Sequence, residues 1–130
     1  MTSIEYSVES HQSVAETVEK LTGELKKRGF GVLSNIDVRK VILEKLGEKL
    51  DPFVILDVCS PRDAKRAIDA HKEVGLVLPC KITVYDDHGK TKVSLYKPTE
   101  AIKVLRFSDL DPLAEEVEGR LKDSLDAISA

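Results

Sequence analysis

The alternation of hydrophobic and polar positions changes its period along the chain, and each change predicts a new element. Residues 4–9 (IEYSVE) alternate apolar and polar side chains, a period of two that predicts a strand with one buried face. Ser13 and Glu16 then stand at the spacing of a capping box, and the apolar residues after them recur at helical spacing. This helix should end at Gly29, because glycine adopts the left-handed C-terminal turn at little cost.

A second strand and a short helix are predicted next. Residues 30–36 have strand character, and Gly31 within them predicts a bulge or a close backbone approach. Asp37 has the chemistry to cap a helix that ends at Gly47. Three apolar residues of this helix are expected to face the core: Val41, Ile42 and Leu46.

The next pair of elements is a strand followed by a helix. Residues 53–59 are apolar except Asp57, which predicts a central strand covered on both faces. Ser60 and Pro61 then favour a helix start, with the Ser60 hydroxyl as the cap and the proline ring at the first helical position.

The remainder of the chain predicts a hairpin and two helices. A strand begins at about Cys80, since Pro79 cannot donate to a sheet ladder. Residues 86–89 (DDHG) favour a tight turn, and alternation resumes beyond them. A short helix over residues 99–105 and a longer one from Asp111 complete the order.

Together these elements predict a single α+β domain over residues 1–130. In it, a mixed sheet of about five strands carries helices packed mainly on one face, and the strand-helix-strand order occurs twice. The sheet face that stays uncovered is then a candidate dimer surface.

Composition narrows the class of protein. Apolar residues make up 42% and charged residues 33%, the balance of a soluble globular protein. A net charge of −3 argues against a nucleic-acid partner, whose phosphates require concentrated Lys and Arg. No apolar window is long enough for a membrane helix, and Glu5 and Glu9 stand where a signal peptide would be apolar. We therefore expect a cytoplasmic protein with no membrane partner, whose two cysteines are reduced.

Several segments resemble a known family. They are GFGVLSNIDV (29–38), KLG (45–47), IL (55–56), CSP (59–61), Ala64 and GLVLPC (75–80). Together they are similar to the domain of unknown function 302 family, over most of the chain from about Glu5 to the last helix. The glycine-phenylalanine-glycine and leucine-proline-cysteine segments, in that order, are the most specific part.

The resemblance implies a small α+β fold, commonly a homodimer, in bacterial and archaeal proteins without an assigned activity. This chain departs from the usual pattern at two positions. Ser60 replaces a common asparagine but retains the capping chemistry. Asn35 replaces a common glutamate, which removes a carboxylate and weakens any acid-base role there.

Cys59 is the foremost candidate for chemistry. It ends a buried strand just before the helix start at Ser60, where the helix dipole and free amides favour a thiolate, and Arg62 adds a positive charge. Cys80 would be a resolving thiol if the two strands are neighbours. The competing interpretation is that both cysteines are small buried apolar residues, which is the commoner role of unpaired cysteine.

Two polar sites are candidates for ligand binding. Asp57 lies on an apolar strand and indicates a pocket, unless it is an acid at the sheet margin partnered by a backbone amide or by Lys81. The other candidate pocket joins Gly31, Ser34 and Asn35 near the predicted Asp37 cap.

No nucleotide, hydrolase or metalloprotease motif is present, and Cys and His lack the close spacing of metal ligands, so neither a cofactor nor a metal is expected. The sequence therefore assigns no reaction. We expect a homodimeric module that binds a small ligand or a protein partner near Cys59. The alternative is a thiol-dependent redox or sulfur-handling protein that uses Cys59.

Overall fold

The computed structural model describes residues 3–130, so residues 1 and 2 of the predicted single domain lie outside the described part. Within residues 3–130 the chain forms, in order, β1 (Glu5–Ser10), α1 (Val14–Lys27), β2 (Gly31–Asp37), α2 (Val38–Leu46), β3 (Phe53–Cys59), α3 (Pro61–Ala70), the 3-10 helix η1 (Lys72–Leu76), β4 (Cys80–Asp87), β5 (Lys90–Tyr96), α4 (Pro98–Lys103), the 3-10 helix η2 (Ser108–Leu110) and α5 (Asp111–Ala127).

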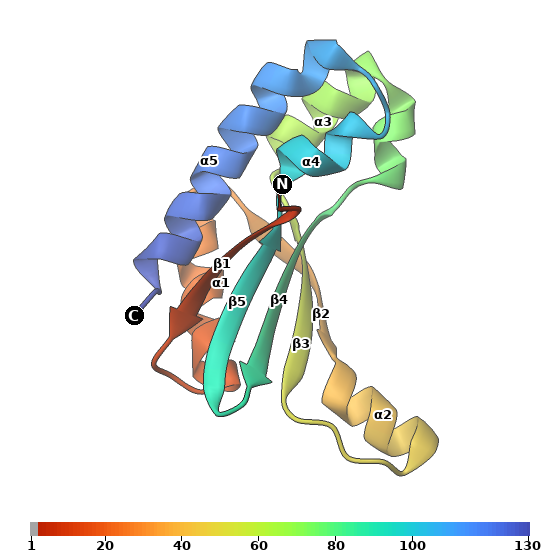
Figure 1. Ribbon diagram of the computed structural model, residues 1–130. Helices are drawn as coiled ribbons and strands as arrows, with labels where there is room; N and C mark the ends of the chain where they lie inside the picture. The colour runs from red at the N-terminus through yellow and green to blue at the C-terminus, as the bar shows by residue number, and fades with distance from the viewer. Residues whose placement is uncertain (1–2) are drawn as a thin grey trace.

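The five strands of the described chain form one sheet in the order β1-β5-β4-β3-β2. Every neighbouring pair is antiparallel, so the expectation of a mixed sheet was wrong. The reason lies in the connections. A parallel pair requires a crossover along the sheet, whereas α2 and α3 each join adjacent strand ends and lie beyond the two ends of the sheet (Figure 1).

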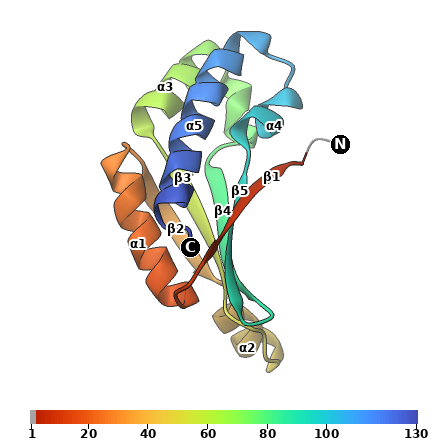
Figure 2. The ribbon, with the colours of Figure 1, turned by 60° about the vertical axis from the view of Figure 1, so that its left-hand side comes forward.

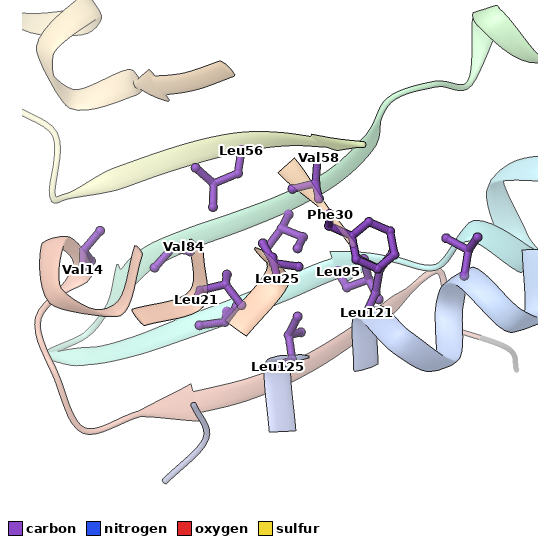
Figure 3. Close-up of a cluster of buried hydrophobic side chains, with 13 residues drawn as sticks. Val14, Leu21, Leu25, Phe30, Leu56, Val58, Val84, Leu95, Leu121 and Leu125 are labelled. Atoms are coloured by element: carbon purple, nitrogen blue, oxygen red, sulfur yellow. The ribbon is translucent and has the colours of Figure 1, made fainter. Parts of the chain in front are cut away.

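Helices α1 and α5 lie side by side across one face of the sheet, as Figure 2 shows, which confirms an α+β architecture with helices mainly on one face. Between them and the strands lies the main core, where Leu21, Leu25, Leu121 and Leu125 are fully buried (Figure 3). Each such side chain stabilises the fold by roughly 1.5–3 kcal/mol relative to an exposed position. The core fixes the sheet firmly against α5.

The predicted local signals are largely confirmed. The Ser13 hydroxyl accepts a hydrogen bond from the Glu16 amide at 3.2 Å, at the start of α1. Gly29 follows α1 with φ +85°, and Gly47 ends α2 with φ +67°. The chain turns between β4 and β5 at His88 and Gly89, both with positive φ, as a tight hairpin requires.

Gly31 was expected to mark a bulge or a close approach. A bulge is present, but the register shift falls between Val32 and Ser34. A Cβ atom added to Gly31 would meet nothing within 4 Å, so no backbone approach requires this glycine.

Two expectations about burial were wrong. None of the nine residues of α2 is buried, and Leu46 is 63% exposed, because α2 projects beyond the sheet and no helix of residues 3–130 packs on it from outside (Figure 1). Strand β3 is covered on one face only. Leu56 and Val58 are buried under the helices, while Ile55 and Asp57 point to the open face and are half-buried.

Candidate functional site

A cavity of about 80 Å³ lies at the end of the sheet where β3 ends and β4 begins. Helices α3, α4 and α5 enclose it from the other side, at the upper end of the molecule in Figure 1. Its walls are mainly apolar. Four alanines contribute to them, and their small side chains leave room between the three helices: Ala64 and Ala67 on α3, Ala101 on α4 and Ala114 on α5.

Both cysteines line this cavity. Strands β3 and β4 are neighbours, and Cys80 pairs in register with Val58, one residue before Cys59. Both thiols are free. The sequence had left their proximity dependent on the strand order, and the sheet brings them to the same site.

The thiols are not activated as anions. Burial, and then the nearby Asp63 carboxylate, raise the pKa of the Cys59 thiol. Burial, followed by Cys59 and Asp63, raises the pKa of Cys80 to about 11. The thiolate that the helix start was expected to favour at Cys59 is therefore disfavoured, because burial removes the charge from water and the Asp63 carboxylate lies nearby.

Ser60 lines the cavity at the N-cap position of α3 but does not cap the helix with its side chain. Its hydroxyl instead donates to Asp63 Oδ2 at 2.7 Å. The predicted side-chain cap was wrong, because the hydroxyl is turned toward the Asp63 carboxylate and accepts from no backbone amide of the helix. Ser60 thus orients an acid on the cavity wall.

Asp63 forms a second, partly buried contact with Arg120 of α5. Burial alone would raise the pKa of Asp63, but hydrogen bonds from Ser60 and Arg120 and the charge of Arg120 hold it below its ordinary value. The Arg120 guanidinium also lies 4.8 Å from the Phe30 ring centre and donates to the Arg28 carbonyl at 2.9 Å. This pair therefore ties α3 and α5 to the end of α1.

Asp57 lies on the open face of the sheet, where it accepts from Ser34 Oγ at 2.5 Å and from Lys81 Nζ at 2.9 Å. The hydrogen bond from Ser34, followed by that from Lys81, lowers the pKa of Asp57. The predicted partnership with Lys81 is confirmed. Asp57 is an ionised acid satisfied by two neighbours.

Lys81 connects this open face to the cavity, because it also lines the cavity together with Tyr96. Ile82 and Leu95 face each other across β4 and β5, so Lys81 and Tyr96, one step further along each strand, lie next to each other. The Lys81 side chain is 49% exposed and Tyr96 is 42% exposed. Both side chains are therefore partly exposed on the open side of the sheet, at the end where the cavity lies.

The remaining sequence candidates do not gather at the cavity. Gly31 and Asn35 are exposed on the edge strand β2, and Arg62 is exposed on α3; none of them contributes to the cavity wall within residues 3–130. Asp37 accepts from the Lys40 amide at 3.1 Å, as predicted for a cap. Ser34 donates to Asp57 rather than toward the Asp37 cap.

The sequence did not predict the partly buried ion pair of Asp63 and Arg120 or the cavity itself. Asp63 was visible as the acid three residues after Ser60, but its partner Arg120 is 57 positions away. The four wall alanines lie on three separate helices, so no local pattern marks them as a group.

The fold and site define a compact α+β domain with a sheet-end cavity, and comparison with known proteins places this domain in a family. The model of the family "domain of unknown function DUF302" matches residues 6–128, and the chain belongs to this family. An uncharacterized conserved DUF302 protein from Bacillus stearothermophilus has a crystal structure similar to this fold, with a TM-score of 0.93 and 36% sequence identity. That similarity covers 98% of this chain and 99% of the other.

Other proteins that match part of this chain are named as ion channels. The chain is 29% identical over 89 residues to the fluoride-specific ion channel FluC 1 of Brucella suis biovar 1 (strain 1330), which is 68% of this chain and 34% of that protein. The FluC 2 protein of Brucella melitensis biotype 1 matches over the same length, 32% of its chain. This chain thus spans about a third of the curated relatives it matches. Among residues 3–130, no helix is both long and apolar enough to cross a membrane.

Proposed function

We propose that this protein is a homodimeric module that binds a small ligand in the cavity between the sheet end and α3, α4 and α5. The observation that carries this proposal is the cavity itself, with its mainly apolar walls. Ligand sites are typically apolar concavities with a few placed polar groups that fix orientation.

The size of the cavity limits the ligand. An apolar cavity of about 150 Å³ holds a benzene ring, so about 80 Å³ suits a group of roughly half that size. The buried polar groups of the wall are already paired, since Asp63 accepts from Ser60 and Arg120. The interior therefore favours an apolar group that requires no hydrogen bond.

The dimer part of the proposal rests on the exposed apolar side chains of residues 33–50, which we term the 33–50 segment. It contains six large exposed hydrophobic residues: Leu33, Ile36, Val41, Leu43, Leu46 and Leu50. A nine-residue helix such as α2 is marginal in water without packing. A second copy that covers this segment would supply that packing, and a symmetric dimer is the commonest assembly.

The thiol alternative has less support. A nucleophilic or redox-active cysteine generally has a lowered pKa, whereas burial raises the pKa of both Cys59 and Cys80. Two free thiols agree with a reducing compartment, which supports a cytoplasmic location for the proposed module.

Native mass spectrometry of the purified full chain tests this proposal, with Ala114→Leu as the variant that fills the cavity. Ala127→Leu, exposed on the same helix, is the matched control. We expect a dimer of the 14.4 kDa chain with a retained small molecule in the wild type and in Ala127→Leu, and a bare dimer in Ala114→Leu. A bare monomer in all three proteins would contradict both parts of the proposal.

A further inference from the structure

We propose that a second copy of this chain pairs antiparallel with the outer edge of β2, so that two five-stranded sheets join into one continuous sheet. This inference rests on the proposed homodimer and adds the contact through which the two copies meet. It is carried by the chemistry of the two sheet edges, the amount of exposed surface and the balance of charge around β2.

The outer edge of β2 is open to pairing. β2 is an edge strand, so a row of its backbone amides and carbonyls points away from β3 (Figure 1). Among the residues that the structure describes, no backbone hydrogen bond joins residues 31–36 to a segment other than β3. These six residues include no charged side chain and no proline, the usual devices that prevent an edge from pairing. Such an edge favours the addition of another strand.

The opposite edge of the sheet is protected. β1 carries Glu5 and Glu9, and the Glu9 carbonyl accepts a hydrogen bond from the Ala130 amide at 2.8 Å. The Tyr6 hydroxyl donates to Asp126 at 2.6 Å, which holds the end of α5 beside this strand. Charge and the C-terminal residues therefore shield β1, and we expect a partner strand at β2 instead.

The side chains of β2 indicate where the two-fold axis lies. The bulge precedes residues 34–37, which form the regular part of the strand. An axis at Ile36, which is 39% exposed, places it against Ile36 of the partner subunit as an apolar cross-strand pair. Asn35 then faces Asp37 of the partner subunit, with an amide donor opposite a carboxylate. The same axis brings α2 beside the bulged part of the partner's β2, where Leu33 is 64% exposed.

The exposed surface is large enough for this contact. The chain exposes 7983 Å². A folded monomer of 14.4 kDa typically exposes about 6,800 Å². The excess of roughly 1,100 Å² is larger than the roughly 800 Å² that each partner buries in a standard interface. Part of it belongs to α2, none of whose nine residues is buried.

The charge around β2 favours a second copy over a charged partner. Residues 31–51 contain four acidic and four basic side chains, so this region carries no net charge. Two copies of it meet without net repulsion, whereas a strongly acidic or basic peptide would find no complementary field. The contact therefore suits the chain itself.

Disulfide cross-linking of the full chain tests the contact. Ile36→Cys places two thiols on the axis, within the Cα separation of about 4.5–7 Å that a disulfide requires. In Asn35→Cys the two thiols are offset by two residues, about 8 Å apart, so this variant controls the register. Ser7→Cys, exposed in the middle of β1, controls for the other edge. Wild-type protein controls for the native Cys59 and Cys80.

Under copper-phenanthroline oxidation at micromolar protein, Ile36→Cys should form a covalent dimer at least about tenfold faster than the three controls. Ile36→Lys, which places two like charges on the axis, should sediment as a monomer. Equal cross-linking of Ile36→Cys and Ser7→Cys, in a wild type that sediments as a dimer, would overturn the β2 contact and retain the dimer. A monomeric wild type would overturn the inference together with the dimer part of the proposed function.

Discussion

Arg120 of α5 and Asp63 in the first turn of α3 form a partly buried ion pair between residues 57 positions apart. Because Ser60 donates to the same carboxylate, this pair joins the wall of the cavity to the helix that spans the sheet. The cavity is thus bounded on one side by polar contacts that hold α3 against α5.

Loss of the Arg120 side chain should destabilise the protein strongly. Arg120→Met leaves the Asp63 carboxylate buried without its main partner, and we expect a loss of about 3 kcal/mol in the free energy of unfolding, measured with urea. Arg66 provides the control. It is 59% exposed and 3.8 Å from Asp63, so Arg66→Met should cost less than about 1 kcal/mol. Equal losses for the two variants would contradict this assignment.

The same acid should make stability depend on pH. The pKa of Asp63 is lower in the folded protein than its ordinary value of 3.8, so its contribution is complete above that value. It is lost as the pH falls through the lower, folded-state pKa. In Asp63→Asn, unfolding free energies between pH 7 and pH 2.5 should therefore fall less steeply than in the wild type. If the unfolding free energies of the two proteins fell in parallel with pH, the titration of Asp63 would not contribute to the pH dependence of stability.

Both thiols should alkylate slowly. Burial raises the pKa of Cys59 and raises that of Cys80 to about 11, so the thiolate is scarce at neutral pH. Rates of iodoacetamide labelling, followed by mass spectrometry across pH, should rise beyond pH 9, with Cys59 faster than the more buried Cys80. A Cys59 rate that titrates below about 8.5, the free-thiol value, would favour the thiol alternative instead.

The proposed dimer should depend on α2. Leu43→Glu combined with Leu46→Glu places two charges on the 33–50 segment, and sedimentation at micromolar concentration should then show a 14.4 kDa monomer where the wild type is a dimer. The control is Leu76→Glu. Leu76 is 83% exposed on η1, at the other end of the sheet, and its substitution should leave the dimer intact. A monomeric wild type would refute the dimer.

Local chemistry made most of the fold predictable. Ser13, Gly29 and Gly47 mark helix ends through contacts with residues a few positions away, and the structure confirms each of them. Strand direction and the exposure of α2 depend on which surfaces meet in three dimensions. These two features escaped prediction for that reason, and the assumption that apolar residues such as Leu46 face a core was wrong.

The site was predictable only in part. Cys59 and Ser60 were identified because both lie at a strand-to-helix junction that local signals define. Arg120 and the wall alanine Ala114 belong to α5 and reach the site through tertiary packing alone. The cavity arises where three helices meet the sheet end, and no single segment contains that information.

A crystal of the full chain equilibrated under xenon pressure tests the central claim most directly, because xenon enters apolar cavities and is located by its own scattering. We predict a xenon atom enclosed by Ala67, Ala101, Ala114 and Val58 in the wild type, and its loss in Ala114→Leu. If Ala114→Leu does not fold, Ala101→Val serves in its place. An empty site in the wild type, under pressure that places xenon elsewhere in the same crystal, would contradict the account.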